Sequence, residues 1–147
     1  MHTRSTRLGQ IEFVETDRVT FPDGLPGFAD ETDFVLMPEA DTPFAFLQSL
    51  HDPDLTFVLA DPFAFYSDYS IELDAQCVAK LALSEDNRPQ IWCIVTVPKQ
   101  PADMTANLLA PVIANRRDNI ACQYVLEKSG YTTRHRLFPQ PAPQGGE

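Results

Sequence analysis

Residues 90–115 read QIWCIVTVPKQPADMTANLLAPVIAN and combine the longest nearly uncharged apolar run of the chain with a dense set of prolines. Within this stretch, residues 91–97 are rich in β-branched and aromatic side chains, which favour strands, and a proline stands at each end. Alternate residues of a strand point to opposite faces, and here both faces are largely apolar. We therefore expect a central strand that is covered on both sides.

The second half of this stretch predicts a short turn followed by another strand. Asp103 is a suitable N-cap for one helical turn over residues 104–107. Pro111 disfavours helix at the residue before it, so residues 112–114 are expected to start a strand. Asn107 is a polar residue in apolar surroundings, and its side chain either caps nearby backbone groups or takes part in recognition.

The rest of the chain reads as short strands separated by prolines and polar turns. One helix is expected, over residues 75–82 with Asp74 as its N-cap. This pattern predicts a mostly β fold, a small antiparallel β-barrel with one short α-helix and short helical turns, although a sandwich fits the spacing as well. We expect one domain over residues 1–138 and a flexible Pro/Gly-rich tail over residues 139–147. The further expected strands cover residues 11–15, 19–21, 34–37, 44–50, 56–60, 70–73 and 120–126.

Negative charge is concentrated in the middle of the chain. The net charge is −10, and residues 21–90 hold fourteen acidic residues against Lys80 and Arg88. Such a surface repels nucleic acid and membrane phosphates and attracts a basic protein, particularly one that itself binds nucleic acid. The alternative is that the acids only keep a small domain soluble.

The remaining composition predicts a cytoplasmic protein that does not enter a membrane. Three widely spaced cysteines without a CxxC motif favour reduced, buried thiols over disulfides or a zinc site. The N-terminal residues lack the apolar stretch of a secretory signal, and no apolar run approaches the roughly 20 residues that span a bilayer.

The sequence contains few patterns that are typical of catalysis. The chain has no GxSxG, GxGxxG, HExxH or phosphate-binding loop. His51 with Asp52 and Asp54 is the best candidate for a metal site, but Asp-Pro-Asp is more typical of a turn. We therefore expect a protein that is not an enzyme, with no catalytic residue, cofactor or metal.

Two segments are candidates for contact with a partner. FPDGLPGF, residues 21–28, is a rigid loop in which Leu25 and Phe28 either plug an end of the sheet or are exposed for contact. FAFYSDY, residues 63–69, holds four aromatic rings in seven positions, and its first two phenylalanines are expected in the core.

Four blocks of sequence together resemble the FliW family of bacterial flagellar assembly factors, in the same order and with the same spacing. The resemblance covers about residues 8–137 and agrees with the β-barrel expected above. The blocks are FPDGLPGF at 21–28, FLQSLHDPDLTFVLADPFAFYSDY at 46–69, IVTVPKQPADMTANLLAPVIAN at 94–115 and YTTRHRL at 131–137.

The resemblance implies a non-enzymatic regulator. Proteins of this family bind CsrA, an RNA-binding translational repressor, and relieve its repression of flagellin mRNA. They also bind flagellin, so that the two partners are exchanged. We expect this chain to be a monomer that contacts both proteins but no nucleic acid directly. The alternatives are a flagellin chaperone without CsrA antagonism and a ligand-binding β-barrel enzyme. The residues expected at a partner interface are the acids Asp52, Asp54 and Asp61, the apolar anchors Leu25 and Tyr69, and Asn107.

Overall fold

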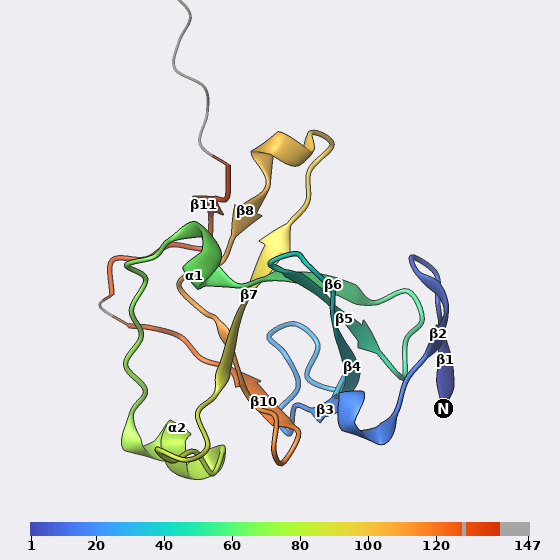
Figure 1. Cartoon of the computed structure of the whole chain (residues 1–147), viewed down its shortest axis with the longest axis horizontal. Coiled ribbons are helices and arrows are strands. Elements are labelled where there is room, and N and C mark those ends of the chain that lie inside the picture. The colour runs from blue at the N-terminus through green and yellow to red at the C-terminus, as the bar shows by residue number, and fades with distance from the viewer. Residues whose placement is uncertain (128, 139–147) are drawn as a thin grey trace, which may run out of the picture.

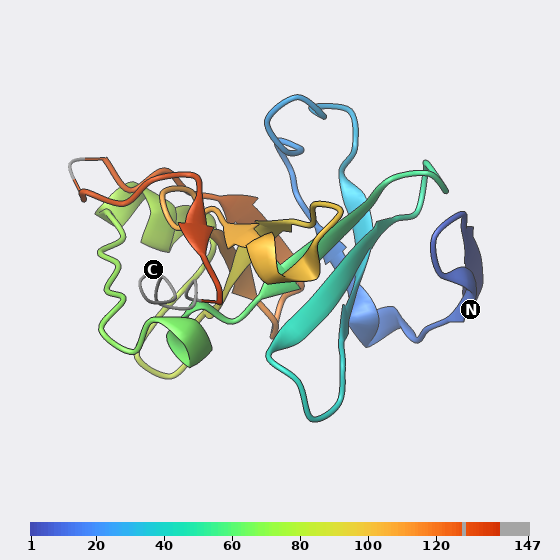
Figure 2. The ribbon, with the colours of Figure 1, turned by 90° about the horizontal axis from the view of Figure 1, so that it is seen from above.

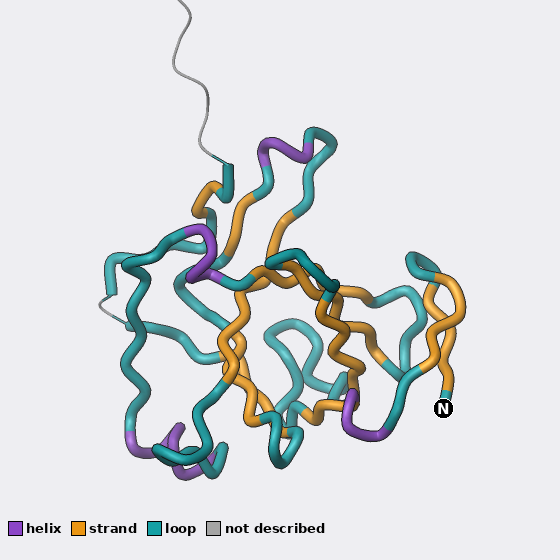
Figure 3. Tube along the Cα trace, viewed as in Figure 1, coloured by secondary structure: helices purple, strands orange, loops and turns teal. Residues whose placement is uncertain are grey.

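The structure is a computed structural model that describes residues 1–127 and 129–138. The expected tail over residues 139–147 lies outside these described residues. In the described part, the fold is mostly β, as the sequence predicts, and its main feature is a closed barrel (Figures 1 and 3).

Seven strands form the barrel. Neighbouring strands are hydrogen-bonded in the order β7-β6-β5-β4-β3-β10-β9, and an additional pairing between β7 and β9 closes the ring. All pairings in the ring are antiparallel except that between β3 and β10. The strands are β3 (Arg18–Thr20), β4 (Asp33–Pro38), β5 (Phe44–Ser49), β6 (Thr56–Ala60), β7 (Gln90–Thr96), β9 (Val112–Asn115) and β10 (Ile120–Gln123).

The other elements lie around this barrel. β1 (His2–Ser5) and β2 (Gly9–Glu12) form a separate two-stranded hairpin at the N-terminus, to one side of the barrel in Figure 2. β8 (Thr105–Ala106) pairs with β7, and β11 (His135–Arg136) pairs with β8. Short helical segments complete the described fold: η1 (Glu15–Asp17), α1 (Pro62–Phe65), α2 (Ala75–Lys80) and η2 (Pro101–Asp103). No helix among the described residues is long and apolar enough to cross a membrane.

The barrel interior is filled by its own side chains. A fully buried valine, leucine or phenylalanine side chain stabilises the fold by about 1.5–3 kcal/mol, because its apolar surface leaves water. The phenyl rings of Phe21 and Phe34 meet edge-on with their centroids 5.3 Å apart. A second cluster, under α1 and the C-terminal segment, includes Tyr69, Cys93 and Leu108. The main cluster consists of Val19, Phe21, Leu25, Phe34, Leu36, Ala45, Leu47, Leu59, Val112, Ala114 and Ala121.

Several local predictions are confirmed. The strand predicted at residues 56–60 is β6. The carboxylate of Asp74 caps α2 by accepting a hydrogen bond from the backbone N–H of Cys77, at 2.7 Å. The helix is shorter than expected, because it ends at Lys80 rather than at residue 82. The predicted central strand is β7, and its buried residues are Cys93 and Val95.

Two predicted elements are wrong, and one strand is shorter than expected. The helical turn over residues 104–107 does not form, because the chain turns earlier, through η2, and Thr105 then pairs with Thr96 of β7. Residues 70–73 lie outside any strand. The strand predicted at residues 120–126 forms as β10 but ends at Gln123. Beyond it, the backbone N–H groups of Tyr124 and Leu126 still donate to the carbonyls of Pro111 and Leu109.

Candidate partner-binding surface

His51 does not assemble a metal site with the neighbouring aspartates. Its Nδ1 lies 3.1 Å from Oε2 of Glu31, a side chain that is largely buried. Among the described residues, no group of three or more His, Cys, Asp and Glu side chains is placed to hold a metal ion. The contact joins the loop between β5 and β6 to the loop that precedes β4.

Asp52 and Asp54 lie together in the loop between β5 and β6. The side chain of Asp52 accepts a hydrogen bond from the backbone N–H of Asp54, at 2.9 Å, which shapes the turn. Asp54 accepts one from the hydroxyl of Thr6, and the backbone N–H of Thr6 donates to Pro53 O at 2.8 Å. Neither carboxylate forms an ion pair within the described part of the chain, so both remain available to a cation.

Asp61 lies at the other end of β6. Its carboxylate caps α1 by accepting a hydrogen bond from Phe63 N at 3.0 Å, and its own N–H donates to Pro43 O at 2.8 Å. Five residues of extended strand separate it from residues 52–54, which corresponds to about 17 Å. Figure 2 shows the loops before and after β5 at opposite ends of the barrel. The three acids therefore do not form one compact cluster, and contact of each with a partner stays a prediction.

The FPDGLPGF loop covers one mouth of the barrel, at the same end as the loop between β5 and β6 (Figures 2 and 3). Leu25 points into the core and is 3% exposed, so it plugs the barrel and does not stand at the surface as an anchor. Gly24 has φ +66°, and a Cβ there would lie 2.6 Å from the backbone oxygens of Phe28 and Ala29. The loop conformation therefore requires glycine at this position.

Phe28 is the apolar side chain that this loop exposes. It is 40% exposed, and its ring meets that of Phe57 edge-on at 5.7 Å. The loop that carries Asp52 and Asp54 lies at the same end of the barrel, so this end presents both an apolar side chain and acids, the two components of a typical protein interface. We call Phe28, Asp52 and Asp54 the loop surface.

Tyr69 is also buried, at 4% exposed. Its hydroxyl donates to Leu108 O at 2.7 Å, and its ring lies 4.7 Å from that of Tyr131. Burial and the neighbouring Cys93 raise the pKa of its hydroxyl above the usual value. Tyr69 is therefore a core residue in this structure, and its hydroxyl is protonated at neutral pH.

Asn107 caps local backbone. Its side-chain oxygen accepts a hydrogen bond from Ala110 N at 2.9 Å, and its own N–H donates to Ile94 O at 2.9 Å. These hydrogen bonds satisfy backbone groups of the turn that leads into β9. A direct contact of Asn107 with a partner stays a prediction.

Phe63 is an exposed residue that the sequence reasoning placed in the core. It is 43% exposed and lines a notch of about 300 Å³ together with Trp92 and Asp61. The signal that could have found it is Asp61-Pro62, an N-cap followed by proline at the first helical position. This start of α1 turns Phe63 outward, whereas Phe65 packs against the core.

Comparison with known proteins decides the family. The family model described as FliW protein matches residues 2–137. The chain belongs to the FliW family. A flagellar assembly factor FliW from Desulfitobacterium hafniense is 44% identical, with all of both chains covered. One from Heliobacterium modesticaldum is 46% identical over 97% of this chain and 94% of its own.

The FliW fold is also found among solved structures. A crystal structure of the flagellar assembly factor FliW superposes with a TM-score of 0.86 at 39% identity, covering 95% of this chain and 98% of that one. The family resemblance inferred from the four sequence blocks is therefore confirmed, and so is the β-barrel. In this FliW protein, the residues of FPDGLPGF that shape the barrel mouth include Gly24 and Leu25, whose roles are structural.

Proposed function

We propose that this FliW-family protein regulates flagellin synthesis without being an enzyme. In this proposal it binds the translational repressor CsrA, relieves the repression of flagellin mRNA, and exchanges CsrA for flagellin. Family membership over residues 2–137 is the observation that carries the proposal. Its relatives are flagellar assembly factors, which supports the same function.

The loop surface suits a basic partner. A protein that binds RNA carries positive charge for the phosphates, and carboxylates attract that charge. Asp52 and Asp54 are free of ion pairs among the described residues, and Phe28 exposes an apolar ring at the same end of the barrel. A negative surface docked next to an RNA site also repels phosphate over a Debye length of about 8 Å at physiological salt.

The test is a binding titration of purified CsrA against the double variant Asp52→Asn/Asp54→Asn. Asparagine keeps the turn-forming oxygen but removes the charge, so the fold is preserved. We expect CsrA binding to weaken about fivefold to thirtyfold, since each lost charge pair at an interface contributes about 0.5–1 kcal/mol or more. Asp61→Asn is the matched control, because asparagine keeps the cap and lies at the other end of β6.

Equal losses in the control and the double variant would remove the loop surface from the proposal. Failure of the unmodified protein to bind CsrA, with flagellin still bound, would favour a flagellin chaperone without CsrA antagonism. Displacement of bound CsrA by flagellin, followed by gel shift of flagellin mRNA, tests the exchange itself.

A further inference from the structure

Two of the three cysteines lie next to one another between α2 and β10. Cys77 is in the first turn of α2, and Cys122 is in β10, so the two are far apart in the chain. Both belong to the apolar cluster under α2, and their thiols are close enough to interact through a hydrogen bond. The third cysteine, Cys93, lies in a different cluster, in contact with Tyr69.

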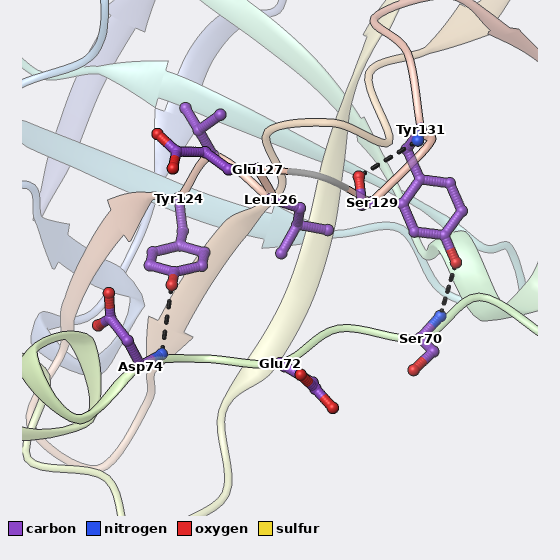
Figure 4. A pocket seen from close by; sticks show the side chains of 9 residues that line it. Ser70, Glu72, Asp74, Tyr124, Leu126, Glu127, Ser129 and Tyr131 are labelled. Atoms are coloured by element: carbon purple, nitrogen blue, oxygen red, sulfur yellow. Dashed lines mark hydrogen bonds between the residues drawn. The ribbon is translucent and has the colours of Figure 1, made fainter.

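Hydrogen bonds at both ends of α2 hold its cysteine in this position. At the start of the helix, the backbone N–H of Asp74 donates to the hydroxyl of Tyr124, just beyond β10, at 3.2 Å (Figure 4). At its end, the buried side chain of Asn115 in β9 donates to Leu81 O at 2.7 Å. The helix is therefore fixed over β9 and β10, and this arrangement places the two thiols together.

A pocket of about 450 Å³ gives small molecules access to the pair from solvent. The pocket lies between α2 and the FPDGLPGF loop, and both cysteines line it. Cys77 is 5% exposed, whereas Cys122 is partly exposed. Cys122 is therefore the thiol that a small oxidant reaches first, and Cys77 is its buried neighbour.

We propose that Cys77 and Cys122 form a site of reversible oxidation, at which an intramolecular disulfide links α2 to β10. The oxidant is a small disulfide such as oxidised glutathione. The thiolate of Cys122 attacks one of its sulfurs and releases one glutathione, and the thiolate of Cys77 then attacks Sγ of Cys122 and releases the second. The protons of the two cysteine thiols end on the two released glutathione thiolates, so one disulfide is reduced as the other forms.

The chemistry of the pair sets the conditions under which it reacts. Burial raises the pKa of both thiols, that of Cys122 to about 12, so only a small share is thiolate at neutral pH. The pair therefore responds slowly, to sustained rather than brief oxidation. The site is independent of the regulatory function proposed above, because the reaction needs only this protein and an oxidant.

The test exposes the purified full chain to oxidised glutathione at about pH 9, where a larger share of the thiols is ionised. We expect the mass to fall by two hydrogen atoms, with no added glutathione and no dimer on a non-reducing gel. N-ethylmaleimide then blocks the remaining thiol, and trypsin places the three cysteines on separate peptides, 19–80, 81–99 and 118–128. The linked pair should be 19–80 with 118–128, and dithiothreitol should separate it.

Single variants identify the two sulfurs. Cys77→Ala should keep one glutathione on Cys122, because no neighbouring thiol displaces it, and Cys122→Ser should not form the link. Cys93→Ala is the matched control, since it removes a buried cysteine from the other cluster and should leave the link unchanged.

The link should also have a thermal and a kinetic signature in the unmodified protein. It should raise Tm by about 5–15 °C, because a disulfide restricts the unfolded chain. Its rate of formation should rise about tenfold per pH unit between about pH 7 and pH 9, because the thiolate is the reacting form.

Three results would overturn the proposal. They are a stable glutathione adduct of the unmodified protein without the linked peptide pair, a link that includes Cys93, and a Tm that falls on oxidation. Peptide mapping of the unmodified protein keeps the test decisive if a variant fails to fold. CsrA plays no part in these measurements, so failure of the regulatory function would leave their outcome unchanged.

Discussion

Two walls of the same barrel are built very differently. β4, β5 and β6 are paired with one another from end to end, and they carry Phe34, Leu47 and Leu59 into the core. The seam between β3 and β10 has one residue pair, Ile120 with Thr20. This small barrel therefore concentrates its stability in the wall of β4, β5 and β6. The other wall, at the seam, keeps an unpaired strand edge.

The largest change in the free energy of unfolding should come from a substitution in the wall of β4, β5 and β6. Leu47 is 1% exposed in the main core cluster. Leu47→Ala should lower the free energy of unfolding by about 3 kcal/mol, through lost burial and the cavity that remains. Urea unfolding followed by circular dichroism measures this. A loss below about 1 kcal/mol would mean that the wall does not dominate the stability.

The next largest change in the free energy of unfolding should come from the FPDGLPGF loop, which follows β3. Gly24→Ala should cost about 2 kcal/mol or more, because alanine is strained at φ +66° and its Cβ meets backbone oxygens at 2.6 Å. Gly27→Ala is the matched control, since φ is +83° but nothing lies within 4 Å of the added carbon. Its cost should stay at about 1–2 kcal/mol. Equal costs would show that the close approach at Gly24 is not limiting.

The N-cap of α2 should contribute less to the free energy of unfolding. Asp74→Ala removes the acceptor for Cys77 N and should cost about 1 kcal/mol, whereas Asp74→Asn should cost a few tenths. The same unfolding experiment compares the two. An equal loss in both variants would assign the effect to charge rather than to the cap.

The seam edge should contribute least. Val125 is 52% exposed, so Val125→Ala should change the free energy of unfolding by less than about 0.5 kcal/mol. A loss comparable to that of Leu47→Ala would remove the distinction between the two walls.

The sequence predicted the local features of this molecule better than its closure. The strand over residues 56–60 and the cap at Asp74 depend on neighbours in the chain, and both are present. The seam depends on Thr20 and Ile120, a hundred residues apart, and no local pattern encodes one parallel pair. The pairing of β7 with β9, which closes the ring, joins residues of one stretch, 90–114, yet no local pattern specifies it either.

The predicted contact residues show the same difference between features set by chain neighbours and features set by the tertiary fold. Turn chemistry explains Asp52, and Asp61 caps α1, so their residue types have local reasons. Leu25 and Tyr69 were expected as anchors, but each is buried, because the loop folds over the barrel mouth and α1 turns the aromatic segment. Exposure of Phe28 and Phe63 depends on that tertiary arrangement, which composition alone does not specify.

Burial also affects the cysteine on the seam strand. It raises the pKa of Cys122 to about 12, so the thiol is protonated at neutral pH and reacts slowly.

Native-state hydrogen exchange along one strand tests the open seam most directly. The amides of Cys122, Tyr124 and Leu126 face β9 or its extension, whereas those of Gln123 and Val125 point away from β9. We predict alternating protection in the free protein, slow at 122, 124 and 126 and fast at 123 and 125. Uniform protection from 122 to 126 would mean that the edge is already paired, and it would contradict the account.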